Sequence, residues 1–153
     1  MNFDLLDIVS NKPEIKQNNI LIYSSFIFIT NILHFFYKKY YIYSLLFFIL
    51  YITSIIYHSD NNFLSNILDK VAICGVVSYG LYMLNDKADF NTSTQSILIS
   101  FTIGFTFLSV IYLFIYGRYI NNYCFNPDTC ISNYFHCLIH LISSFGHHLI
   151  ILL

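Results

Sequence analysis

Five long apolar runs, separated by short polar breaks, follow one another along the chain. Each run is 17 to 20 residues long, and about 20 residues of helix cross a hydrocarbon core of about 30 Å. A lone strand would leave backbone groups without hydrogen bonds in lipid, so each run predicts a transmembrane helix. The pattern predicts an all-α, polytopic integral membrane helical bundle of about five transmembrane helices, with one single bundle over residues 20–153. The predicted spans are residues 20–36, 40–57, 67–84, 97–116 and 134–153.

The segments between and before these runs are more polar. Asn126-Pro127-Asp128 is a turn signal before the fifth run. Residues 59–66 are expected to form a short turn between the second and third runs. Residues 1–19 are expected to be an N-terminal tail or a short interfacial segment, two alternatives that the residues leave open.

Composition supports a bilayer as the surroundings of this chain. It is 57% hydrophobic and 10% charged, with a mean hydropathy of +0.63, whereas soluble domains carry about 25% charged residues. So few charges do not cover a water-facing surface, which predicts an integral, multipass membrane protein with the lipid bilayer as its partner. The net charge of −1 leaves no basic patch to neutralise phosphates, and this excludes nucleic acid as a partner.

Counting the spans places several polar residues on one side of the membrane. If side A is the face on which the N-terminus lies, the second run ends on side A, and the third and fifth runs begin there. Ser54 and His58 then lie in the last turns of the second run, and Asp69 lies in the first turn of the third. His136 and His140 lie in the first two turns of the fifth. These five residues from three helices are expected to meet near side A.

Three histidines in this group are candidate metal ligands. His136 and His140 are four residues apart, so both imidazoles project from one face of a helix and can bind one metal ion. The alternative is that the pair only hydrogen-bonds to neighbouring helices or to interfacial water. With His58, the pair would supply three ligands and leave one position open, as in catalytic zinc sites. We therefore expect a Zn²⁺ site near one membrane face.

Asp69 and Ser54 add a carboxylate and a hydroxyl beside the expected ligands. A carboxylate at the hydrocarbon edge costs roughly 2.5–3.5 kcal/mol and needs a partner. Lys70 is adjacent in sequence but points about 100° away on a helix, whereas a histidine-bound metal and its water would be a suitable partner. The alternative is that Asp69 lies among the headgroups and is solvated there. In a catalytic role, Asp69 would transfer the proton of a zinc-activated water, and Ser54 would stabilise an oxyanion.

The pattern Ser54-Ile-Ile-Tyr-His58, Leu68-Asp69-Lys70-Val71-Ala72-Ile73 and His136-Cys-Leu-Ile-His140 resembles a known superfamily. Its members are the alkaline ceramidases, the progestin and adipoQ receptors, and the hemolysin III-type membrane proteins. The resemblance implies a membrane hydrolase with zinc on the three histidines, Asp69 as proton shuttle and Ser54 beside the ligands or as oxyanion donor. Those families have seven spans and this chain has five. Two helices of the seven-span families would be missing here between the span with Asp69 and the last span. Because this number is even, His136 still enters the membrane from side A.

Three functions follow from these residues. The first is a zinc-dependent membrane hydrolase of a lipid amide or ester bond, with a membrane lipid as substrate. The alternative is a non-catalytic, metal-stabilised multipass protein, receptor-like or accessory. A bis-histidine haem protein, for example with His58 facing His140, would explain neither Asp69 nor Ser54. A five-span bundle has less interior, so its substrate slot would open to lipid or require a second copy, and a homo-oligomer is a further possibility.

The other histidines and the cysteines receive simpler interpretations. His34 is expected at the interface, with nothing in the sequence to pair with it, and His148 has no special role. His147 shares the face of the pair but lies about 10 Å deeper, where it is expected to bond another helix, such as Ser78 or Thr102, or to serve as a pathway residue. The four cysteines make no disulfide-dense pattern. Cys124 and Cys130 share a loop and could form a disulfide in an oxidising compartment.

Overall fold

The computed structural model describes residues 19–60, 62–88 and 93–153, and within them every regular element is a helix. The expected N-terminal tail therefore lies outside the described residues, except that its last residue begins the first helix. The elements are α1 (Asn19–Ser25), α2 (Ile27–Tyr37), α3 (Tyr41–Asp60), α4 (Phe63–Lys87), α5 (Thr94–Ile111), the π-helix η1 (Tyr112–Tyr116), α6 (Gly117–Ile120), the 3₁₀ helix η2 (Tyr123–Phe125) and α7 (Thr129–Leu152).

The predicted fold class is confirmed, because five helical stretches are long and apolar enough to cross a membrane. The first run is covered by α1 and α2 together, and the fourth by α5, η1 and α6. The five stretches are Ile20–Tyr37, Tyr41–Asp60, Phe63–Lys87, Thr94–Ile120 and Thr129–Leu152.

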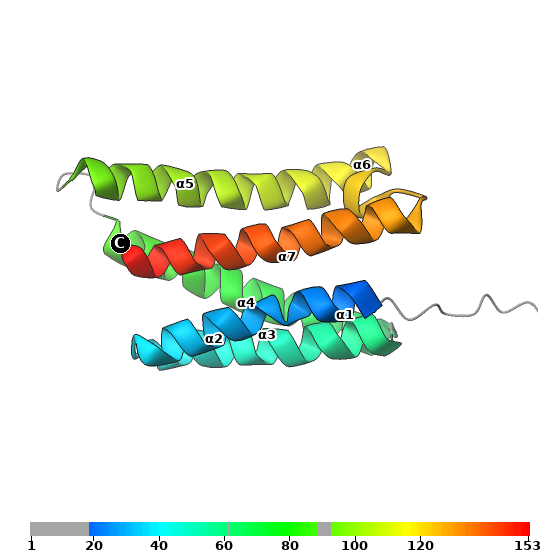
Figure 1. Cartoon of the computed structure of the whole chain (residues 1–153), viewed down its shortest axis with the longest axis horizontal. Coiled ribbons are helices and arrows are strands. Elements are labelled where there is room, and N and C mark those ends of the chain that lie inside the picture. Colours follow the sequence, from blue (N-terminus) through cyan, green and yellow to red (C-terminus); the bar gives the residue numbers. More distant parts are fainter. Residues whose placement is uncertain (1–18, 61, 89–92) are drawn as a thin grey trace, which may run out of the picture.

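Helix α7 is the central element of the bundle (Figure 1). It packs against α5 on one side and against α1 and α2 on the other, and it also touches α4. Helix α3 packs against α1, α2 and α4. The start of α1, the end of α3 and the start of α7 lie at the same end of the bundle, which is side A of the sequence analysis.

Side-chain caps decide where two of the helices begin, and both begin earlier than the apolar runs predict. The Asn62 side chain accepts a hydrogen bond from the Ser65 backbone N–H at 2.8 Å, so α4 starts at Phe63. The expected turn over residues 59–66 is therefore wrong, and Asp69 lies in the second turn of α4 instead of the first. Asp128 caps α7 in the same way, which makes this helix five residues longer at its start and puts His136 more than one turn deeper.

The first span bends where two serines stand side by side. Between α1 and α2 the backbone makes 3₁₀-type bonds around Phe26, from Phe26 N to Tyr23 O at 3.2 Å and from Ile29 N to Phe26 O at 3.1 Å. The hydroxyls of Ser24 and Ser25 both donate to the Leu21 carbonyl, at 2.8 and 3.0 Å. Serine hydroxyls bonded to the preceding turn bend helices. The bend occurs at the level where α1 faces both α3 and α7.

Large rings fill the space between α3 and α7. In the described part of the chain the backbones of these two helices do not approach closely, yet their side chains meet. Phe35 of α2 stacks on Tyr43 of α3 with ring centroids 4.4 Å apart, and Phe47 of α3 lies 5.1 Å from His147 of α7. The core between α3 and α7 is therefore aromatic. The wide separation of these two helices also leaves room for histidine side chains at the side-A end.

Candidate metal centre

The structure brings together the three histidines that the sequence singled out. His58 projects from the end of α3, and His136 and His140 project from consecutive turns of α7. Each offers one ring nitrogen to a group in which all such atoms lie within 4.8 Å of one another. The ring centroids are 5.0 Å apart for His58 and His136, 5.6 Å for His58 and His140, and 5.0 Å for His136 and His140.

The spacing of these nitrogens fits a divalent cation after a small inward movement. Zinc binds imidazole nitrogen at about 2.0–2.1 Å, which places ligand atoms about 3.3 Å apart in a tetrahedral site. The observed limit of 4.8 Å is larger, so the rings would have to close by roughly 1 Å, which is within the reach of side-chain rotation. Three imidazoles are also a donor set that suits zinc.

Ser24 fixes the tautomer of His140. Its hydroxyl has one proton, which it donates to the Leu21 carbonyl. The 2.9 Å contact between Ser24 Oγ and His140 Nδ1 must then be a bond that the imidazole N–H donates. His140 therefore carries its proton on Nδ1 and presents a lone pair on Nε2, and a hydrogen bond on the other nitrogen orients metal-binding histidines in this way.

Two buried polar atoms in this region have no hydrogen-bond partner among the described residues. They are Nε2 of His58 and Oδ1 of Asp69, and their residues are 8% and 7% exposed. A buried polar group without a partner costs about 1–3 kcal/mol, so such atoms are rare in folded proteins. A cation held by the three histidines would give the buried His58 imidazole a partner, and the residues present therefore fit a metal ion.

Asp69 lies beside α3 and outside the group of candidate ligand atoms. The Thr53 and Tyr57 side chains of α3 lie close to its carboxylate, and the Thr53 hydroxyl donates to the Leu50 carbonyl of its own helix at 3.1 Å. As the sequence suggested, Lys70 does not pair with it directly. The Lys70 ammonium donates to the Asn66 amide oxygen and lies 5.6 Å from the centroid of the Tyr57 ring. Oδ1 of Asp69, which has no described partner, is thus free to accept a hydrogen bond or to take up a proton.

Ser54 connects α3 to α1 one turn before His58. It is 1% exposed, and its Oγ lies 3.1 Å from Oγ of Ser25. Because Ser25 donates its own proton to Leu21, Ser54 is the donor in this contact. Its role as an oxyanion donor stays a prediction, and that role would require the Ser54 hydroxyl to turn away from Ser25.

Ser24 and Ser25 were not singled out from the sequence. The signal was present, because the two serines are adjacent in an otherwise apolar run. Phe28 was also not considered, and its ring packs 5.0 Å from that of His140. The contact between α1 and α7 that makes these residues relevant joins segments more than 110 residues apart, and periodicity does not reveal it.

The interpretations of the other histidines need correction. His34 has a partner, since its Nδ1 lies 2.7 Å from Nδ1 of His148, so the expectation that nothing pairs with it is wrong. His147 does bond another helix, but its partner is the Tyr43 hydroxyl of α3. The two expected partners face elsewhere: Ser78 is exposed on α4, and Thr102 donates to the Leu98 carbonyl of its own helix.

The proposed disulfide is not formed. Cys124 is buried in η2 and Cys130 is exposed in the first turn of α7, and both are free thiols. The loop therefore gives no indication of an oxidising compartment.

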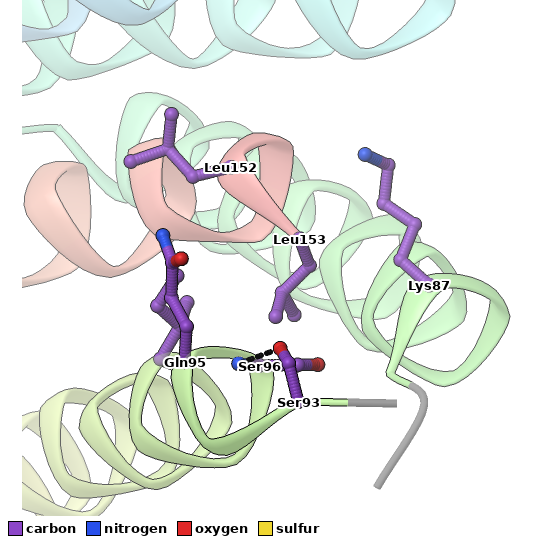
Figure 2. Close-up of a pocket in the computed structure, with 7 residues that line it drawn as sticks. Lys87, Ser93, Gln95, Ser96, Leu152 and Leu153 are labelled. Atoms are coloured by element: carbon purple, nitrogen blue, oxygen red, sulfur yellow. Dashed lines mark hydrogen bonds between the residues drawn. The ribbon is translucent and has the colours of Figure 1, made fainter. Parts of the chain in front are cut away.

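A pocket of about 300 Å³ lies at the other end of the bundle (Figure 2), far along α7 from His136 and His140. It lies where the end of α4, the start of α5 and the end of α7 meet, and the Ser96 backbone N–H donates to Ser93 Oγ at its edge. It takes no part in the candidate metal centre. Its lining residues are Lys87, Ser93, Gln95, Ser96, Ile99, Leu152 and Leu153.

Comparisons of the chain with models of protein families, with curated proteins and with solved structures found no match. The resemblance to the ceramidase and receptor superfamily therefore rests on the quoted serine, aspartate and histidine pattern alone.

Proposed function

We propose that this chain is an integral membrane protein and a zinc-dependent hydrolase of a lipid amide or ester bond. The observation that carries the proposal is the group of three histidine nitrogens within 4.8 Å of one another, from α3 and α7. The unpartnered carboxylate oxygen on the neighbouring α4 supports it. His58, His136 and His140 would hold the ion, and when bound it supplies a Lewis acid and a water whose pKa is lowered to about 7.

Asp69 would be the proton carrier of this reaction. Its carboxylate oxygen Oδ1 is buried and has no described partner, which supports this role. A carboxylate beside an attacking water takes a proton from it and transfers the proton to the leaving amine or alkoxide. Ser54 would donate a hydrogen bond to the oxyanion after leaving Ser25.

The depth of the centre supports a lipid substrate. His58 is two residues from the end of α3, and Asp69 is six residues from the start of α4. At 1.5 Å of rise per residue, both lie within about 10 Å of the helix ends, whereas His140, eleven residues into α7, lies about 16 Å from the start of that helix. The shallow side of the centre, at His58, is therefore at the depth of the ester and amide bonds of membrane lipids, between the headgroups and the hydrocarbon core.

A second function, a metal site that only stabilises the bundle, is favoured by one observation. The backbones of α3 and α7 make few close approaches along the described chain, so an ion between His58 and His140 would tie together two helices that are otherwise weakly packed on each other. Under this alternative the chain is a receptor-like or accessory protein, and Asp69 is dispensable for metal binding and for any lipid change.

The decisive experiment combines metal analysis with a lipid assay on the purified chain in detergent. We expect about one zinc per chain, its loss in His136→Ala, and its retention in Asp69→Asn. Fatty acid release from ceramide and ester lipids, followed by mass spectrometry, should fall about 10²–10⁴-fold in Asp69→Asn. Asp60→Asn is the matched control, because this exposed carboxylate lies at the same end of the bundle.

Each outcome decides between the two functions. Bound zinc without hydrolysis of either lipid class supports the metal-stabilised protein. Hydrolysis that is equal in the wild type and in Asp69→Asn removes the proposed role of this carboxylate. Absence of zinc from the folded wild-type chain contradicts both functions.

A further inference from the structure

A second polar cluster lies at the opposite, side-B end of the first span and α7. His34 is three residues before the end of α2, and His148 is four residues before the end of α7. Their Nδ1 atoms are 2.7 Å apart, and Nε2 of His148 lies 3.0 Å from Oγ1 of Thr30. None of these residues takes part in the candidate metal centre, so the cluster needs its own explanation.

The hydrogen bonds of the cluster determine where its protons are. Thr30 donates its hydroxyl proton to the Ile27 carbonyl at 2.7 Å. The contact between Thr30 and His148 is therefore a bond donated by Nε2–H of His148. This leaves Nδ1 of His148 without a proton, so Nδ1–H of His34 donates to it. In the neutral cluster, Nε2 of His34 then carries a free lone pair.

One added proton strengthens this arrangement, and a second one breaks it. A proton on Nε2 of His34 makes an imidazolium that still donates to His148, now through a charge-assisted bond of about twice the ordinary strength. A further proton on His148 would place two N–H groups against each other at 2.7 Å. The pair is therefore built to hold a single positive charge, next to the C-terminal end of α2, where a cation is favoured by the helix dipole.

The surroundings of this charge are cationic on one side and aromatic on the other. Lys38, the residue that follows α2, is close enough to act on His34 electrostatically. Phe35 packs against the His148 ring with centroids 5.7 Å apart. Behind His148 stands His147, which bonds the Tyr43 hydroxyl of α3. Lys38 repels a charged His34, and an anion between the two would relieve this repulsion.

We propose that His34, His148 and Lys38 form a proton-dependent site for the phosphate of an anionic lipid headgroup at the side-B face. The position fits this ligand, because Lys38 is exposed immediately beyond the end of a membrane-spanning helix, at the level of lipid phosphates. Basic groups between transmembrane helices at this level bind anionic headgroups. Since proton and phosphate favour each other's binding, their affinities are linked.

Lipid retention measured by native mass spectrometry tests the proposal. The full chain is placed in nanodiscs of phosphatidylcholine with a minor fraction of phosphatidylglycerol, in steps from pH 8 to pH 4.5, and the lipid adducts are counted. We expect one retained phosphatidylglycerol, with at least tenfold higher occupancy at the acidic end of this range than at pH 8, because the histidine pair takes up a proton there. His34→Gln should abolish the pH dependence, and Lys38→Gln should lower occupancy at every pH value.

The controls separate this site from general charge attraction. Lys70→Gln removes an exposed lysine at the side-A end and should leave the adducts unchanged. Lys38→Gln is at an exposed position, so its effect does not depend on whether His34→Gln folds normally. Equal phosphatidylglycerol and phosphatidylcholine adducts, or unchanged pH dependence in His34→Gln, would overturn the proposal. Displacement of the lipid by an equal concentration of inorganic phosphate would show that the site takes soluble anions instead.

Discussion

His140 donates a hydrogen bond from Nδ1 to the hydroxyl oxygen of Ser24, at 2.9 Å across the contact between α1 and α7. The bond places the His140 proton on Nδ1 and leaves Nε2 free to bind an ion, because Ser24 has already given its own proton to Leu21. The bend of the first span therefore contributes to the candidate metal centre, although no residue of α1 is a candidate ligand.

Replacement of Ser24 by alanine should weaken zinc binding without unfolding the bundle. Loss of a hydrogen-bond partner on the far side of a metal-binding histidine typically lowers metal affinity about 10–100-fold. Competition with a chelator of known affinity measures the change. Ser143→Ala is the control, because the Ser143 hydroxyl bonds the His140 carbonyl of its own helix and not the imidazole. Equal affinities in the two variants would contradict the role of Ser24.

Zinc should also stabilise the folded chain. An ion at 100 times its dissociation constant adds about 2.7 kcal/mol to the free energy of unfolding if it binds only the folded state. For a chain of this length, this corresponds to a rise in melting temperature of roughly 5–10 °C. A strong chelator should reverse the rise in the wild type and in His34→Gln, and it should have no effect on His136→Ala. A chelator-independent melting temperature in the wild type would argue against the ion.

The span count and the meeting of His58, His136 and His140 were predictable from the sequence. Hydropathy reports the length of each apolar run, and the parity of the spans decides which ends lie on the same side. Both are properties of the chain that do not depend on how the helices pack. The capping residues Asn62 and Asp128 could also be recognised in the sequence. The helix starts were still placed too late, because polar residues follow each cap and the apolar runs begin only after them.

The partners across helix contacts were not predictable. His34 and His148 pair only because α2 lies beside α7, and Tyr43 reaches His147 only because rings, not backbones, fill the space between α3 and α7. In a membrane bundle the lipid-facing and the core-facing positions of a helix are both apolar, because hydrocarbon surrounds the bundle. Periodicity therefore gives little information about which face meets which neighbour.

The two cysteines of the loop before α7 should react differently with iodoacetamide. Burial raises the pKa of the Cys124 thiol to about 11, while Cys130 is exposed. The thiolate is the reactive form, so at pH 8 only about one Cys124 in a thousand is ionised, and its alkylation rate should rise about tenfold per pH unit up to pH 11. Peptide mass spectrometry should find Cys130 modified first at pH 8. Equal rates for both thiols at pH 8 would contradict the burial of Cys124.

The Tyr43–His147 hydrogen bond should depend on the absence of a side chain at position 80. A Cβ on Gly80 would lie 2.7 Å from Cε1 of His147 and 2.8 Å from the Tyr43 hydroxyl. Gly80→Ala should therefore separate these groups and lower the free energy of unfolding by about 1–3 kcal/mol. Gly75→Ala on the same helix is the control, since its Cβ would meet Leu46 at an ordinary 3.6 Å. Urea unfolding in detergent compares the two, and equal stabilities would show that the space at Gly80 is not needed.

Gly146 determines how closely α5 approaches α7. A Cβ on this residue would clash with Oγ1 of Thr106 and lie 3.2 Å from its Cβ, so the Thr106 side chain or the two helices must shift. Gly146→Ala should cost about 1–3 kcal/mol of stability, and Thr106→Ala in the same chain should recover part of it, giving a coupling energy of at least about 0.5 kcal/mol. Gly104→Ala, on α5 with nothing within 4 Å of its Cβ, should be neutral or slightly stabilising. Thermal unfolding of the four variants measures the cycle. Additive effects of Gly146→Ala and Thr106→Ala would mean that α5 does not rest on α7 at this point.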